Sequence, residues 1–157
     1  MTDYKFENRS KISYTFLRII SKLTKFNSET RNYGTDKPLH EAEIHMIKSI
    51  KENEGIHITA LAEMLGITKG AVSQISIKLE KKGMIIKVPD PANLSRLQMK
   101  LTEKGEIAHR YHLKLHKMFD DSFYHIVNKL TEEEKAVLRK FLNDLDNEMI
   151  KILKKEI

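Results

Sequence analysis

Apolar residues recur at intervals of three and four along the N-terminal part of the chain, which is the spacing of amphipathic helices. The pattern predicts one helix over residues 6–27 and a second over about residues 39–52. Between them lies a segment rich in turn formers, and Asp36 with Pro38 is typical of a helix start. Gly55 then ends the second helix, because glycine adopts the left-handed conformation that is favoured there.

The pattern then changes to shorter elements. Two brief helices are expected over residues 59–66 and 69–82, and Gly83 closes the second of them. The stretch MIIKVPDPANLSRLQMKL predicts two short strands, at about residues 84–88 and 96–101, with a turn of Pro, Asp and Asn between them. Such a pair of strands forms a hairpin, or wing.

Two longer helices are expected to complete the chain. Thr102 can cap a helix whose apolar residues keep to one side. Thr131 and Glu134 fit a capping box that begins a last helix, which extends to about residue 155. The predicted fold class is therefore mainly α, in the order α-α-α-α-β-β-α-α.

The composition limits the classes of function that the chain can have. The chain has 157 residues, of which 40% are apolar and 32% charged, as expected of a globular chain with a real core. A net charge of +6 and a pI near 9.4 favour a polyanionic partner. The absence of cysteine excludes disulfides, thiolate zinc sites and cysteine nucleophiles. Without an apolar run of membrane-spanning length or a signal-peptide pattern, we expect a cytoplasmic protein that does not enter a membrane.

The stretch ITALAEMLGITKGAVSQISIKLEKKG has helix-turn-helix spacings. The small side chain of Ala62 lets the two short helices approach each other, and Gly66 forms the turn between them. Val72 and Ile75 pack the second helix against the first. The residues between the packing positions carry short or basic side chains suited to base edges and phosphates in a major groove. They include Lys69, Gly70, Ser73, Gln74, Ser76 and Lys78, and Thr68 precedes them. Helix pairs of this shape also occur in protein-binding folds, which is the alternative.

The order LAEMLGIT, KGAVSQ, LEKKG, a wing and then LTEKG resembles the MarR family of winged-helix repressors. The resemblance implies a winged helix-turn-helix region at residues 39–101 and a helical dimerisation region formed by residues 1–38 and 102–157. It also implies a homodimer that presents the helix of Lys69 to Lys78 to each half of a palindromic site in double-stranded DNA.

The wing departs from the pattern of that family. The family's wing usually carries Asp-x-Arg, whose arginine enters the minor groove, but the corresponding positions here hold Asn93 and Ser95. Arg96 follows one place later. A narrow minor groove attracts any guanidinium that reaches it, yet a shift of one residue in a strand turns a side chain to the opposite face. We include Asn93, Ser95 and Arg96 among the expected DNA contacts.

Histidines gather in the segment HRYHLKLH, residues 109–116. His112 and His116 are four apart, so their imidazoles lie over one another on a helix and can chelate one ion. The second helix supplies His45, and Glu29 lies in the loop before it. Imidazole and carboxylate are zinc ligands. The alternative is a solvated helix face, since the neighbouring lysines and arginine would repel a metal.

The resemblance bears on these histidines as well. The adhesin competence repressors, a zinc-responsive branch of the MarR family, have a histidine pair that aligns with His112 and His116. Their other ligands are a histidine in the second helix and a glutamate in the preceding loop, for which His45 and Glu29 are the approximate counterparts.

The sequence therefore predicts a regulator of transcription, expected to be a repressor, with Zn²⁺ as a candidate effector and no required cofactor. An organic-ligand-responsive regulator of the same fold and an architectural DNA-binding protein are the alternatives. A metal-dependent hydrolase is disfavoured, because no HExxH motif, Ser-His-Asp arrangement or phosphate-binding Gly-rich loop is found. We expect no enzymatic activity.

Overall fold

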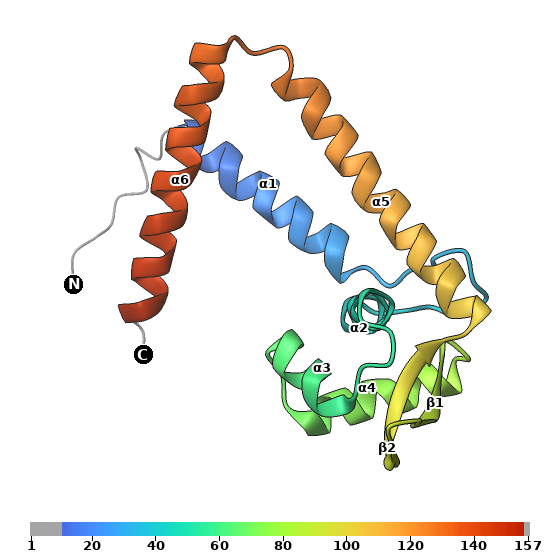
Figure 1. The fold of residues 1–157 in the computed structure, drawn as a ribbon. Coiled ribbons are helices and arrows are strands. Elements are labelled where there is room, and N and C mark those ends of the chain that lie inside the picture. Colours follow the sequence, from blue (N-terminus) through green and yellow to red (C-terminus); the bar gives the residue numbers. More distant parts are fainter. Residues whose placement is uncertain (1–10, 156–157) are drawn as a thin grey trace, which may run out of the picture. The chain divides into compact units, whose positions relative to one another are not determined.

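The computed structural model describes residues 11–155, apart from the side chains of Lys11, Ser95 and Lys155. The order of elements is the predicted one, and the predicted fold class is confirmed (Figure 1). The elements are α1 (Lys11–Ser28), α2 (Glu41–Glu52), α3 (Ile58–Leu65), α4 (Lys69–Lys81), β1 (Ile85–Asp90), β2 (Asn93–Leu101), α5 (Glu103–Val127) and α6 (Glu132–Lys155). The expected first residues of α1, 6–10, lie outside the described part. The chain divides into two compact units, residues 1–112 and 113–157, which are described in turn.

The core of the first unit is built from α2, α3, α4 and the base of the hairpin. Its apolar side chains come from positions three and four apart on each helix, which places them on one face. The largest of the fully buried ones are Leu39, Ile44, Met46, Ile47, Ile50, Leu61, Val72, Leu79, Met84, Ile85 and Met99. This core fixes α4 and the hairpin as neighbouring parts of one rigid body.

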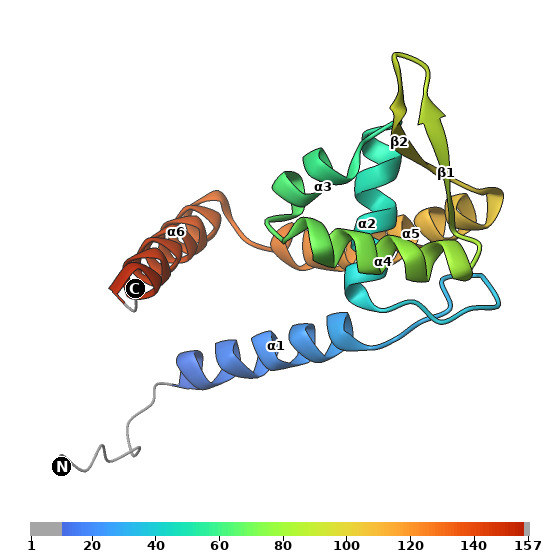
Figure 2. The same ribbon diagram turned by 90° about the horizontal axis from the view of Figure 1, so that it is seen from below.

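The hairpin projects beyond the helices of the first unit (Figures 1 and 2). Its strands are antiparallel, and the register runs regularly from Ile85 opposite Leu101 to Pro89 opposite Leu97. It then breaks, because Asp90 pairs with Asn93. Just before α3, an isolated antiparallel bridge joins His57 to Gln98 on β2, and the Met99 N–H donates to the Ile56 carbonyl over 3.1 Å.

The start of α2 differs from the prediction based on Asp36 and Pro38. The helix begins at Glu41, because the backbone N–H of His40 donates to the Glu43 carboxylate over 2.8 Å and so caps it. Asp36 instead pairs with Lys104 on α5. Hydrogen bonding to the Lys104 ammonium lowers the pKa of the Asp36 carboxyl.

A buried ion pair ties α2 to the end of α4. The Glu43 residue is 3% exposed, and both its oxygens accept from the Lys82 ammonium at 2.7 Å. The same ammonium also donates to the Pro38 carbonyl at 2.8 Å. Glu43 therefore has a structural role that its sequence position alone does not reveal.

The start of α5 is fitted closely against the end of α4. The Thr102 hydroxyl donates to the Gly83 carbonyl at 2.6 Å and accepts from the Gly105 N–H at 3.1 Å, so it caps the helix as predicted. A Cβ added at Gly105 would lie 2.1 Å from the Met84 carbonyl oxygen. Only glycine fits this approach without displacing backbone.

The second unit consists of the C-terminal part of α5 and α6. Thr131 and Glu134 form the predicted capping box, with the Thr131 N–H donating to the Glu134 carboxylate at 2.8 Å and the Glu134 N–H to the Thr131 hydroxyl at 3.2 Å. Among its described side chains α6 buries none. No helix within residues 11–155 has the length and apolar character that crossing a bilayer requires.

Candidate nucleic-acid interface and histidine cluster

Helix α4 presents a polar, partly basic face. The Thr68 hydroxyl caps it by accepting from the Ala71 N–H at 3.1 Å. Of the predicted contact residues on this helix, Lys69, Gly70, Gln74 and Lys78 are exposed, as is Thr68, and Ser73 is half-buried. The helix therefore offers donors, acceptors and positive charge on one surface, which is the combination that major-groove recognition uses.

One predicted contact residue of α4 is buried. Ser76, grouped with the contact residues in the sequence, is fully buried and donates to the Ser73 carbonyl at 2.9 Å. It lies four residues after Val72 and three before Leu79, so the helical period places it on the packed face. Ile77 is exposed instead and adds an apolar group to the outer face.

The positive charge of α4 extends one turn beyond the predicted contacts. Lys81 is exposed like Lys69 and Lys78, and none of the three has an acidic partner among the described residues. Lys82 and Lys87, by contrast, are paired with Glu43 and Glu80 at 2.7 Å. The unpaired lysines can therefore meet phosphates at no loss of internal ion pairs.

The wing carries the other predicted contacts at its irregular tip. Asn93 and Arg96 are exposed on β2, while Ser95 is described by its backbone alone. Because Asn93 pairs with Asp90 and Leu97 with Pro89, residues 94–96 bulge out of the ladder. Side chains in this bulge do not follow the regular alternation between the two faces of a strand. Arg96 therefore need not point away from the DNA, although it lies one residue after the family's usual arginine position.

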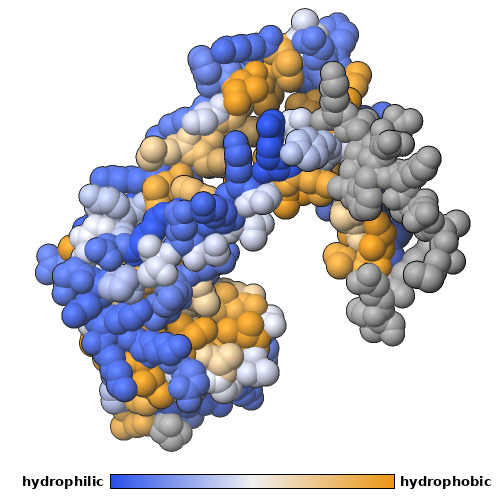
Figure 3. Space-filling view, turned by 180° about the vertical axis from the view of Figure 1, so that it is seen from behind, coloured by the Kyte–Doolittle hydropathy of each residue, from blue (hydrophilic) through white to orange (hydrophobic). Residues whose placement is uncertain are grey.

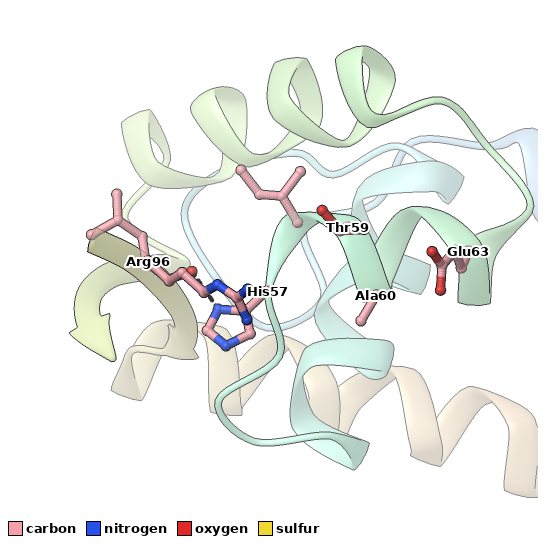
Figure 4. A pocket seen from close by; sticks show the side chains of 7 residues that line it. His57, Thr59, Ala60, Glu63 and Arg96 are labelled. Carbon is pink, nitrogen blue, oxygen red and sulfur yellow. Dashed lines mark hydrogen bonds between the residues drawn. The ribbon is translucent and has the colours of Figure 1, made fainter. Parts of the chain in front are cut away.

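Arg96 lies over the beginning of α3. With His57, Thr59 and Glu63 it lines an open groove of about 570 Å³ between α3 and the wing. Figure 4 shows the Arg96 side chain extending to the imidazole of His57. His57 is a functional candidate that the sequence analysis missed, since a single histidine before a short helix matches no motif.

The structure brings part of the predicted histidine cluster together. His112 is 5% exposed, and its ring meets the ring of His45 edge to face with centroids 5.5 Å apart. Tyr33 contacts His112 in the same manner at 5.9 Å. Aromatic packing accounts for this arrangement without a ligand.

The remaining predicted ligands have other surroundings. Glu29 is exposed, and its carboxylate accepts from Arg31 at 2.9 Å. His116, one turn after His112 on α5, is exposed. Within the part of the chain that the structure describes, no three His, Asp or Glu side chains are grouped closely enough to hold a metal ion.

His109 differs from the other histidines because it is buried with an unsatisfied ring nitrogen. The residue is 8% exposed, and among the described residues its Nε2 has no hydrogen-bond partner. Burial lowers the pKa of His109 below its usual value, and the nearby Lys51 and Lys48 act in the same direction, while Glu106 and Glu52 oppose them. The neutral imidazole is therefore the form that the fold favours.

The burial of the His109 ring predicts that the free energy of unfolding decreases in acid. Because the pKa of His109 is lower in the folded state than in the unfolded state, the unfolded chain takes up the proton first as pH falls below about 6.5. Stability should be full above that pH and decline below it. We expect a His109→Leu variant to lose less stability than the wild type between about pH 7.5 and about pH 5.5. Denaturant unfolding at each pH measures this, and parallel curves for the two proteins would contradict it.

Comparison with known proteins agrees with the geometry. The family model described as the MarR family matches residues 39–108. The HTH-type transcriptional regulator YhjH of Bacillus subtilis is 30% identical over 113 residues, 72% of this chain and 65% of that protein. The regulator PchR of the same species is 32% identical over 108 residues, 69% of this chain and 64% of that protein. The alignments thus span just under two thirds of these relatives' length.

Solved structures share the fold. FabT of Streptococcus pneumoniae, in complex with DNA, superimposes with a TM-score of 0.70 at 25% identity, covering 90% of this chain and 97% of that one. ZitR of Lactococcus lactis, described as a zinc-responsive MarR family member, gives a TM-score of 0.72 at 22% identity, covering 88% and 96%. Residues 39–108, which hold the helix-turn-helix and the wing, match the MarR family, and the flanking helices follow in the order of these solved structures.

Proposed function

We propose that this protein is a homodimeric transcriptional repressor that binds a palindromic operator through α4 and the wing. The observation that carries the proposal is the exposed face of Lys69, Gln74 and Lys78 beside a projecting hairpin that bears Arg96. A family match over residues 39–108, which hold all these groups, supports it. The family consists of transcriptional regulators rather than enzymes, which agrees with the expected lack of catalysis.

The homodimer is supported by the apolar surface of the terminal helices. Large side chains on α1, α5 and α6 are exposed in the single chain, among them Ile12, Leu17, Met118, Phe123, Val137 and Leu153. Figure 3 shows apolar side chains at the surface near the turn that joins α5 and α6. Apolar surface of this extent is typical of a subunit interface, and a second copy would place a second α4 on the other half of a palindrome.

The direct test is base readout by Gln74. Its amide can bond an adenine edge, whereas Lys78 is suited to a phosphate. We expect Gln74→Ala to weaken binding to an operator selected from random duplexes by about tenfold and to leave non-specific binding unchanged. The matched Lys78→Ala variant should weaken both by similar factors and reduce the salt slope by about one. Fluorescence anisotropy at several salt concentrations measures both. Equal losses in the two assays for Gln74→Ala would argue against base readout.

Zn²⁺ is the effector that we propose for this regulator. The His45 and His112 rings, with centroids 5.5 Å apart, support it, and His116 lies one turn further along α5. ZitR, which shares the fold, is described as zinc-responsive. A metal that joins α2 to α5 would bias the angle between the DNA-binding region and the helices beyond it, which is how a ligand couples to a distant site. A small organic ligand is the alternative effector.

The zinc proposal predicts a metal-dependent affinity. Added Zn²⁺ should change specific DNA affinity at least about tenfold relative to chelator, or about 1.4 kcal/mol of coupling. The double variant His112→Ala/His116→Ala should lose the response, while His125→Ala, an exposed histidine on the same helix, should keep it. If the wild type binds equally in chelator and in zinc, the zinc proposal fails, and small organic ligands become the candidates to test.

A further inference from the structure

His57 connects the beginning of α3 to both strands of the wing. Its Nδ1 lies 3.1 Å from the Leu97 carbonyl oxygen on β2, and its Nε2 lies 3.1 Å from a carboxylate oxygen of Asp90 on β1. The backbone of His57 also bridges to Gln98. One side chain therefore contacts both strands of the hairpin. Figure 4 shows His57 at the beginning of α3, beside Arg96.

The partners of His57 restrict its protonation state. A carbonyl oxygen and an ionised carboxylate only accept hydrogen bonds, and a neutral imidazole has a single N–H. The carboxylate of Asp90 is also held in place, since the residue is 8% exposed and its other oxygen accepts from the Ala92 N–H at 2.9 Å. Both contacts are satisfied together only when the ring is an imidazolium that donates from each nitrogen.

The clasp formed by His57, Asp90 and the Leu97 carbonyl stands next to the break in the strand register. Beyond Pro89 and Leu97 the regular ladder stops, and residues 94–96 are not paired with β1. The position of this tip relative to α3 therefore depends on contacts such as the clasp more than on the sheet. Arg96, whose guanidinium is the expected minor-groove group, belongs to the tip.

We infer that His57 is a positioning residue whose imidazolium form fixes the wing and its Arg96 for DNA binding, so that operator affinity rises as pH falls. The inference rests on the proposed function. The charged groups facing the imidazole are Asp90 from β1 and Arg96 from β2, with Glu63 further along the same groove on α3. The clasp closes when the ring carries a proton on both nitrogens and opens when it carries only one, so operator affinity follows that change.

The test compares operator affinity at about pH 8 and at about pH 5.5, the range over which histidines change charge. Wild-type affinity should be about tenfold higher at the lower pH, as expected for losing or gaining a charge-assisted hydrogen bond. His57→Phe keeps a ring but no donors, so it should bind at the weaker level at both pH values. His125→Gln, an exposed histidine on α5, controls for general effects and should keep the wild-type response.

Asp90→Asn is the more informative variant. Its amide can donate to Nε2 of a neutral imidazole, whose Nδ1–H still donates to the Leu97 carbonyl, so the clasp closes without a proton. This variant should hold the stronger affinity at both pH values. A His57→Phe protein that retained the full pH response, or an Asp90→Asn protein as pH-dependent as the wild type, would overturn the inference.

A measurement on the free protein separates the clasp from the proposed function. Under the conditions in which the wild type binds the operator more tightly, nitrogen chemical shifts of the His57 ring should show both nitrogens protonated in the wild type and one protonated in Asp90→Asn. Amides of residues 93–97 should exchange more slowly when the clasp is closed. If no duplex bound specifically at either pH, the proposed function would fail, while these signals would still support the clasp. A singly protonated His57 ring throughout would overturn it.

Discussion

Gly105→Ala is expected to lower the free energy of unfolding by about 3 kcal/mol, the upper end of what overpacking costs. The added methyl would be built 2.1 Å from the Met84 carbonyl oxygen and 3.3 Å from the Leu101 Cβ. The first of these atoms belongs to the backbone, and the Thr102 N–H already donates to it at 3.0 Å. The junction can therefore relax only by moving α5 away from the end of α4, which breaks the cap at Thr102.

The matched control is Gly70→Ala in α4. An added Cβ at Gly70 meets only the Thr68 hydroxyl at 3.9 Å, and alanine is intrinsically the better helix former by up to about 1 kcal/mol. The same chemical change should thus be neutral or slightly stabilising at one glycine and strongly destabilising at the other. Denaturant unfolding monitored by circular dichroism measures both. A loss below about 1 kcal/mol for Gly105→Ala would show that the junction is not close-packed.

The contrast between the two glycines marks the limit of sequence reasoning for the fold. Element types and order follow from periodicity and caps, because Thr102, Thr131 and Gly66 act through residues close to them in sequence. The approach of Gly105 to Met84 depends on tertiary packing, for which the sequence holds no local signal. The start of α2 was misplaced for a related reason, since its cap comes from the side chain of Glu43.

In the candidate site, too, some features follow from the local sequence and others depend on tertiary contacts. The exposure of Lys69, Gln74 and Lys78 follows from their helical period, and the same period, applied more strictly, would have placed Ser76 in the core. The contact of His57 with Asp90 joins residues 33 positions apart across a hairpin whose register is irregular. No alternation pattern predicts such a contact, because the bulge at residues 94–96 decides which residues of the wing reach α3.

Glu43→Ala is expected to cost about 3 kcal/mol, the lower end of the range for breaking a buried ion pair by removing one partner. The carboxylate side chain is 4% exposed and that of Lys82 is 23% exposed, so the ammonium left behind can recover only part of its hydration. The variant also removes the acceptor for the His40 N–H at the start of α2. Since Lys82 follows directly after α4, unfolding of this contact would loosen the helix that carries the DNA-binding face.

Three further variants separate the pair from general effects. Lys82→Met should be nearly as costly as Glu43→Ala, because it leaves the buried carboxylate without its partner. The double variant Glu43→Ala/Lys82→Met should recover much of the loss, since an apolar pair needs no hydration. Asp144→Ala removes an exposed partner of Lys140 on α6 and should cost below about 0.5 kcal/mol. If the double variant lost the sum of the two single losses, the ion pair would contribute no coupling, and the stability of the α2–α4 contact would rest on its apolar core alone.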